Sequence, residues 1–202
     1  MEISITHLAT LYMIVLGPLK VIGPFAMTTL NADRALQRKI ACRAFLLSTV
    51  ISLVIAALGG FLMSRLNMSV GTLAIVMGIF LGHWALQTAL AQNVQTTPPE
   101  QPNIEVAIFP ISLPVIIPPQ GIALLVLSTD IELEAHAGYG LLLVMALIVL
   151  VMFLNWLFML AAPSLMKFPV IWIIVGRIVA VIVSALALQI ILFGLRNLEI
   201  VA

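Results

Sequence analysis

Long apolar runs separated by short polar connections dominate the sequence. Six of these runs are close to the roughly 20 residues that a helix needs to cross the hydrocarbon core of a bilayer. They predict six transmembrane helices within a single transmembrane domain over residues 1–202, with no soluble domain. The expected spans are Ile5 to Leu30, Ala41 to Met63, Ser69 to Ala91, Glu105 to Thr129, Gly138 to Ala162 and Ile171 to Gly194.

The composition fits a chain that lies in a lipid bilayer. Of its 202 residues 63% are hydrophobic and only 8% are charged, whereas soluble domains carry roughly 25% charged residues. The mean hydropathy is +1.24. No basic run indicates a nucleic-acid partner, and the single cysteine, Cys42, excludes an internal disulfide and belongs to no metal-site motif.

The few charges indicate an orientation. The connections on one side would hold most of the basic residues, and the acidic stretch "DIELEAH" (130–136) lies on the other side. Cytoplasmic connections carry the excess of lysine and arginine, so we expect both termini outside the cytoplasm. The expected cytoplasmic side holds Arg34, Arg38, Lys39, Arg43 and Lys167, and the opposite side holds Arg65 and Arg196.

An internal repeat divides the chain. "GPFAMTTLNAD" (23–33) aligns with "QGIALLVLSTD" (120–130) at an offset of 97, and "AIVMG" (74–78) aligns with "WIIVG" (172–176) at an offset of 98. The halves are about 1–95 and 104–202, each with three spans. Because three is odd, the second half enters the membrane from the opposite face. We therefore expect an all-α fold of two inverted three-helix repeats, an arrangement characteristic of secondary transporters.

Spans 1 and 4 hold equivalent places in the two halves, and both are interrupted. Span 1 contains Gly17-Pro18 and Gly23-Pro24, and span 4 contains Pro110, Pro114 and "PPQG" (118–121). Irregular backbone at this depth is tolerated where protein buries it or where it lines a wet cavity. Pro24 and Pro119 suit the first turn of a new half-helix, whose free N–H groups attract an anionic ligand. The alternative is that the prolines only kink packed helices.

We predict a substrate site between the two breaks. Lys20 would either supply a cation or fill a vacated cation site, and the alternative is that its side chain reaches an interface or caps carbonyl groups. The predicted site residues are Pro18, Lys20, Gly23, Pro24, Thr28, Pro114, Pro118, Pro119, Gln120 and Gly121. Further polar residues lie inside the spans and would support the site or simply join helices by hydrogen bonds: His83, Gln87, Asn155, Arg177 and Gln189.

Carboxylates are absent from the span interiors, since all eight acidic residues fall outside them. Membrane proton relays commonly need a buried carboxylate, so a proton-driven pump is disfavoured and His83 is its one titratable candidate. The sequence has no paired-Asp protease core, no HExxH and no nucleophile elbow. We therefore expect no enzyme activity, no catalytic residue, no metal site and no cofactor.

Three stretches resemble the MarC family, which includes the SnatA-type transporters of small neutral amino acids. They are "GPLKVIGPF" (17–25), "AIFPISLPVIIPPQGIA" (107–123) and "ALQIILFGL" (187–195). The resemblance implies a multi-pass protein of the bacterial inner membrane with extracytoplasmic termini and a substrate site at the breaks of spans 1 and 4. It covers essentially the whole chain.

The match to the family motifs is partial. The first motif reads roughly D/N-P-L-G-N-x-P-x-F, and here Gly17 replaces the acid or amide while Lys20 and Val21 replace Gly-Asn. In the fourth span Pro118 and Gln120 replace two glycines. These positions are where the backbone would approach the substrate. The resemblance therefore implies the fold of the family but not its specificity for small neutral amino acids.

The expected function is an alternating-access carrier or exchanger of a small zwitterionic or anionic solute, with a small neutral amino acid as one candidate. Two alternatives stay open. In the first, a chain with the carrier fold transports nothing and serves as a binding or assembly component of the membrane. In the second, the chain is a LysE-like exporter. The expected partners are the lipid bilayer and the solute, and a second copy of the chain, in a homo-oligomer, is a further candidate.

Overall fold

The computed structural model describes residues 5–90, 102–135, 139–166 and 169–200. Within them no strand occurs, so the prediction of an all-α polytopic membrane protein is confirmed. The elements are α1 (Ile5–Val15), η1 (Pro18–Lys20), α2 (Ile22–Thr28), α3 (Arg34–Arg65), α4 (Val70–Leu90), η2 (Ile104–Ala107), η3 (Ile108–Ile116), α5 (Pro119–Ala135), α6 (Gly140–Leu165) and α7 (Pro169–Asn197).

Five stretches of the described residues are long and apolar enough to cross a membrane, and a bent pair, Ile104–Ile116 with Pro119–Thr129, adds a sixth if counted as one span. The predicted spans agree with these in place, while the helix ends differ. The largest difference is at α3, which begins at Arg34 rather than at Ala41. The Asp33 carboxylate accepts a hydrogen bond of 2.7 Å from the backbone N–H of Leu36. This N-cap starts the helix before the apolar run begins.

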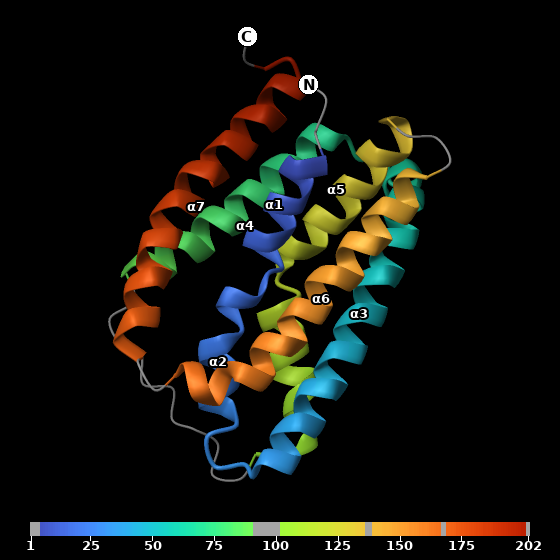
Figure 1. Cartoon of the computed structure of the whole chain (residues 1–202). Helices are drawn as coiled ribbons and strands as arrows, with labels where there is room; N and C mark the ends of the chain where they lie inside the picture. The colour runs from blue at the N-terminus through green and yellow to red at the C-terminus, as the bar shows by residue number, and fades with distance from the viewer. Residues whose placement is uncertain (1–4, 91–101, 136–138, 167–168, 201–202) are drawn as a thin grey trace.

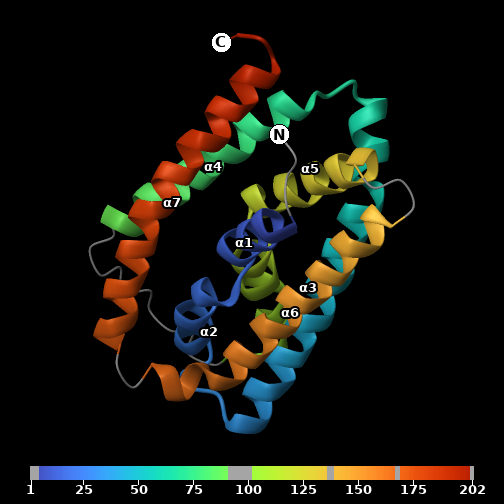
Figure 2. The same cartoon turned by 45° about the horizontal axis from the view of Figure 1, so that its top comes forward.

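The helices form two pairs with the broken spans between them (Figure 1). α3 packs beside α6, and α4 packs beside α7. Figure 2 shows α1 and α2 between these pairs, with α5 behind α1. The beginning of α1 and the end of α7 lie at the same end of the molecule (Figure 1). A broken span followed by two continuous helices thus occurs twice along the chain.

The broken spans lie at the centre of the packing. In the most apolar 18-residue window of the first span half of the residues are buried, against 22% in the corresponding windows of α3 and α7. The largest buried side chains include Tyr12, Leu16 and Phe25 from the first broken span and Ile111 and Ile116 from the second. The outer faces of the long helices expose leucine, isoleucine and valine, as expected for faces in contact with lipid.

Glycines hold α4 and α7 unusually close together. A Cβ atom on Gly71 would lie 2.7 Å from the backbone oxygen of Gly194, and one on Gly194 would lie 2.6 Å from the backbone oxygen of Gly71. Farther along, a Cβ atom on Gly78 would lie 2.8 Å from the Ala187 oxygen. Small residues of this kind let helix backbones approach in membranes, where packing rather than the hydrophobic effect drives association.

Replacing Gly194 by alanine is therefore expected to lower the melting temperature of the purified protein. The added methyl group meets backbone rather than a flexible side chain, and overpacking of this kind costs about 1–3 kcal/mol, which is roughly 2–12 °C for a chain of this size. Gly176→Ala is the matched control in the same helix, because no atom of the described residues lies within 4 Å of a Cβ atom at Gly176. Thermal unfolding followed by tryptophan fluorescence measures both, and an equal response of the two variants would contradict the close α4–α7 contact.

Candidate functional site

The first break separates α1 from α2. Gly17 is extended, with φ −75° and ψ 171°, and a Cβ atom there would lie 1.8 Å from the backbone oxygen of Met13. The turn therefore requires glycine. Pro18 opens η1, where a missing N–H costs nothing because the first N–H groups of a helix have no partner within it.

Of the two dipeptides expected to interrupt span 1, Gly17-Pro18 lies at the discontinuity, and Pro24 lies in the first turn of the new helix, as expected. α2 begins at Ile22, so Gly23-Pro24 lies in its first turn and not at the discontinuity itself. Val21 already has helical dihedral angles, φ −84° and ψ −24°, and Phe25 N donates to Val21 O at 2.9 Å. Pro24 is compatible with this helix because it stands among the first residues, whose N–H groups bond nothing within the helix.

The second break lies between η3 and α5. Phe109 and Leu113 leave helical geometry within η3, with ψ angles of 127° and 124°. Each precedes a proline, and the proline ring disfavours the α conformation at the residue before it. The chain then turns, and the two halves of the span meet at 63°.

α5 begins at Pro119, the first-turn position expected for this proline. The carbonyl oxygen of Pro118 accepts hydrogen bonds from the N–H groups of Gly121 (2.8 Å) and Ile122 (3.1 Å). Two N–H groups of this helix terminus are thus already bonded within the chain. Fewer N–H groups are therefore free to bind an anion at this terminus than in the free first turn that the sequence predicts.

The two breaks lie against each other. The Lys20 ammonium donates hydrogen bonds to Val15 O, at the last residue of α1, and to Ile116 O, at the last residue of η3, the latter at 3.1 Å. A Cβ atom on Gly121 would lie 2.6 Å from the Leu16 side chain, so glycine lets the start of α5 approach the first break. Since helix C-termini carry partial negative charge, one cation stabilises both broken ends at once.

Asn155 of α6 connects the first break to the long helices. Its Nδ2 donates to Leu16 O and to Val151 O, both at 2.8 Å. Leu16 is the residue that follows α1, so this bond satisfies a carbonyl freed by the break. The Asn155 side chain is 1% exposed, and its Oδ1 atom has no hydrogen-bond partner among the residues that the structure describes. A buried acceptor without a partner is costly, and it is the kind of atom that a bound donor would satisfy.

Hydroxyl groups line the surroundings of both breaks. The Tyr12 hydroxyl and Ser128 Oγ share a hydrogen bond of 2.7 Å between α1 and α5. Ser112 Oγ donates to Ala107 O at 2.6 Å and to Ala44 O of α3 at 3.4 Å. Ser48 and Ser52, one turn apart on α3, are fully buried, and their Oγ atoms have no hydrogen-bond partner in the described part of the chain.

The predicted site residues divide by burial. Lys20, Gly23 and Thr28 are intermediate, and the Thr28 hydroxyl donates to Pro24 O at 2.5 Å, a bond within its own helix. Gln120 is 3% exposed and lies at the second position of α5. The buried members are Pro18, Pro118, Gln120 and Gly121, and the exposed members are Pro24, Pro114 and Pro119.

The supporting polar residues do not gather at the breaks, with the exception of Asn155. His83 and Gln87 bond each other at 2.9 Å on an exposed face of α4. Arg177 and Gln189 are exposed on α7. Within the described residues no group of three or more His, Cys, Asp or Glu side chains is placed to hold a metal ion.

Several polar residues near the breaks were not predicted from the sequence. Tyr12, Ser48, Ser52, Ser112 and Ser128 are all buried. Ser48 and Ser52 share a helix face by their spacing of four, and this spacing is the one signal that could have marked them. Serine and threonine are ordinary helix-packing residues in membranes, so the sequence alone does not distinguish these five from the rest.

Comparison with known proteins confirms the resemblance over essentially the whole chain. The model of the "MarC family integral membrane protein" family matches residues 2–199. The searches among curated proteins and among solved structures give no match. The family match spans both broken segments and all the long helices described above, and the chain therefore belongs to the MarC family of integral membrane proteins.

Proposed function

We propose that the chain is a secondary transporter or exchanger of the bacterial inner membrane that binds a small zwitterionic or anionic solute between the breaks of spans 1 and 4. The observation that carries the proposal is the contact between the two breaks, where the Lys20 ammonium bonds the last carbonyl groups of α1 and η3. Discontinuous helices that meet inside the membrane are the usual framework of such sites.

The polar groups at this place suit a solute that carries both charges. Lys20 supplies a cation for a carboxylate. The unpartnered Oδ1 atom of Asn155 supplies an acceptor for an ammonium group, and the buried amide of Gln120 supplies both donors and acceptors. A small neutral amino acid, the substrate of characterised relatives, fits this set.

The order of elements supports alternating access. A broken span followed by two long helices occurs twice, as the proposed inverted repeat requires, and the pairs α3–α6 and α4–α7 stand on either side of the broken spans. Rocking of one pair against the other around a central site is the motion by which repeats of this kind expose a site to each face in turn. The proposed orientation keeps both termini outside the cytoplasm.

Uptake of labelled alanine, glycine and serine into proteoliposomes tests the proposal. We expect saturable uptake of at least one of them, and counterflow when the vesicles are preloaded with unlabelled solute. Empty vesicles and vesicles with heat-unfolded protein are the controls. Absence of flux and of counterflow over a panel of zwitterionic and anionic solutes would overturn the assignment as a transporter.

A second function, a non-transporting binding or assembly component, is favoured by one observation. Lys20 replaces a family glycine and bonds carbonyl groups of both breaks, so the chain itself supplies a group where a solute would bind. Co-purification of a protein partner in a fixed ratio, together with a negative flux panel, would establish this function instead.

Substituting leucine for Asn155 is expected to reduce solute flux about tenfold and to lower the melting temperature by a few degrees. The substitution removes the acceptor Oδ1 and leaves Leu16 O without its donor, and each lost buried hydrogen bond costs about 1 kcal/mol. Gln189→Leu, on the exposed face of α7, is the control and should transport normally. Unchanged flux in folded Asn155→Leu protein would remove Asn155 from the site.

A further inference from the structure

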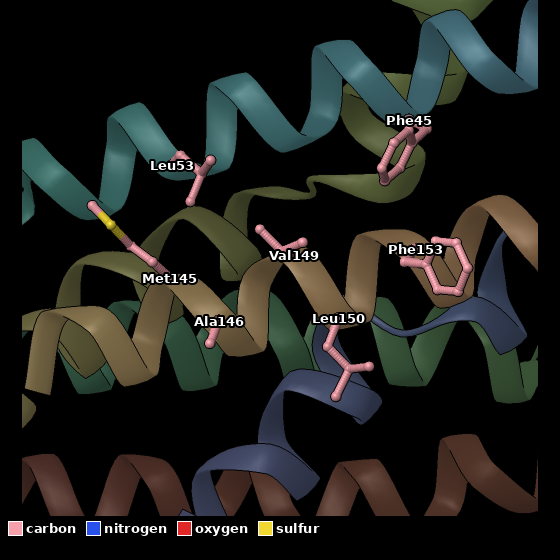
Figure 3. A pocket seen from close by; sticks show the side chains of 7 residues that line it. All are labelled: Phe45, Leu53, Met145, Ala146, Val149, Leu150 and Phe153. Atoms are coloured by element: carbon pink, nitrogen blue, oxygen red, sulfur yellow. The ribbon is translucent and has the colours of Figure 1, made fainter.

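An apolar hollow lies along the face where α3 and α6 meet. It has a volume of about 600 Å³ and is lined by Phe45 and Leu53 of α3 with Met145, Val149, Leu150 and Phe153 of α6. Figure 3 shows Phe45 and Leu53 pointing toward α6 and Val149 pointing toward α3. The lining side chains are all apolar, so the hollow suits a hydrocarbon chain.

A second hollow lies between the beginning of α3 and the end of α6. Its volume is about 220 Å³, and its lining includes Arg34, Gln37 and Arg38 of α3 with Leu160, Pro163 and Ser164 of α6. Gln37 is already committed, since its amide donates to Thr29 O and Ala32 O at 3.1 and 3.2 Å. The two arginines are exposed, and neither has an ion pair within the described residues. This hollow therefore presents two uncommitted guanidinium groups.

Helical periodicity places the two hollows on the same face of α3 and α6, and we call this face the α3–α6 furrow. On α3, Phe45 follows Arg38 by seven residues, which is two turns, and so lies on the same face. On α6, Leu160 follows Phe153 by seven residues in the same way. Trp156 lies between Phe153 and Leu160 in the sequence. Its ring centroid is 6.1 Å from that of Phe45 and 5.7 Å from that of Phe153. The furrow is therefore basic at one end and apolar along its length.

The dimensions match a lipid chain in one leaflet. Arg38 and Leu53 are 15 residues apart on a continuous helix, which at 1.5 Å per residue is about 22 Å. Half of the roughly 30 Å hydrocarbon core is about 15 Å. A phosphate at the arginines would thus leave the whole depth of one leaflet for an acyl chain along the furrow.

We propose that the α3–α6 furrow binds one anionic glycerophospholipid, with its phosphate between Arg34 and Arg38 and an acyl chain along the face between Phe45 and Phe153. Arginine binds phosphate oxygens through paired N–H donors, and basic pockets between transmembrane helices select anionic headgroups. A lipid is the occupant that uses both ends, since a soluble phosphate has no use for the apolar part. The proposal does not depend on the transport function, because the furrow lies on α3 and α6 and not between the breaks.

Native mass spectrometry of the purified full chain tests the site with phosphatidylglycerol and phosphatidylethanolamine of identical acyl chains. We expect the first phosphatidylglycerol to bind at least tenfold more tightly than the first phosphatidylethanolamine. The double variant Arg34→Gln/Arg38→Gln should weaken phosphatidylglycerol tenfold or more and lose the preference. Arg65→Gln, an exposed arginine at the other end of the same helix, should keep it.

Two further measurements test the contribution of the apolar part of the furrow separately from that of its basic end. Val149→Trp, at a position 44% exposed, fills the apolar part and should weaken both lipids. Glycerol phosphate, which has no acyl chain, should bind wild-type protein far more weakly than phosphatidylglycerol does. Equal binding of both lipids by the wild type, a preference retained in the double arginine variant, or equal binding of glycerol phosphate and phosphatidylglycerol would each overturn the proposal. If the double variant fails to fold, the wild-type measurements and Val149→Trp still decide it.

Discussion

Substituting methionine for Lys20 is expected to abolish solute flux and to lower the melting temperature by about 5–10 °C. Methionine keeps much of the length and apolar character of the lysine stem but has no donor. Val15 O and Ile116 O, which the ammonium bonds in the native protein, would then both lack this partner. Leaving a buried polar group unsatisfied costs about 1–3 kcal/mol, and each kcal/mol corresponds to roughly 2–4 °C here. Proteoliposome uptake and thermal unfolding measure the two effects.

Two controls separate the role of the ammonium from a general loss of charge. Lys39→Met, at an exposed position near the start of α3, should have neither effect. In a Cys42→Ala background, Lys20→Cys alkylated with bromoethylamine restores a side chain with an ammonium group and should recover stability and flux. If Lys20→Met protein were as stable as wild type and transported as well, the bridging role of Lys20 would be wrong. If stability fell while the wild type itself showed no flux, the bridge would stand and the transport function would not.

Gly17→Ala is expected to have an effect of similar size on stability through a different cause. A Cβ atom at Gly17 would come within 1.8 Å of Met13 O and 2.6 Å of Met13 C. Both are backbone atoms of α1, so the clash is relieved only if the break opens. Overpacking against backbone costs about 3 kcal/mol or more, a fall of about 6–12 °C in the melting temperature, and the displaced Lys20 would lower solute flux as well.

Gly23→Ala provides the matched comparison within the same broken span. In the described part of the chain no atom lies within 4 Å of a Cβ atom at Gly23, and alanine is the better helix former by up to about 1 kcal/mol. This variant should therefore be as stable as wild type or slightly more stable. The reverse ranking, with Gly23→Ala the less stable of the two, would place the discontinuity at Gly23-Pro24 and not at Gly17.

The apolar runs predicted the spans well because a membrane helix must be apolar over a fixed length. The breaks were predicted as a pair for a similar reason, since glycine and proline are conspicuous inside such runs. Their position within span 1 was harder to predict. Gly17-Pro18 and Gly23-Pro24 look alike as dipeptides, and only the fold shows that one lies at the discontinuity and the other inside the first turn of α2.

The candidate site was less accessible to sequence reasoning. Lys20 was conspicuous as a charge in an apolar run, yet its two acceptors, Val15 O and Ile116 O, are backbone atoms, and the second lies 96 residues away. Backbone carbonyl groups leave no trace in residue identity. The same holds for Leu16 O, the acceptor of Asn155. The sequence pattern identifies the polar side chains. Their hydrogen-bond acceptors are determined by the turns of the fold, which leave backbone carbonyl groups free.

The bond between Lys20 and Ile116 has a consequence for biogenesis. The first three spans are synthesised before the residue that supplies the second acceptor. During that interval the Lys20 ammonium has one of its two carbonyl partners, in a segment whose other groups favour hydrocarbon. Until the fourth span is inserted, the amino-terminal half therefore holds a charged group in the membrane without one of its acceptors, which is costly. The first broken span reaches its final set of hydrogen bonds only when the second is in place.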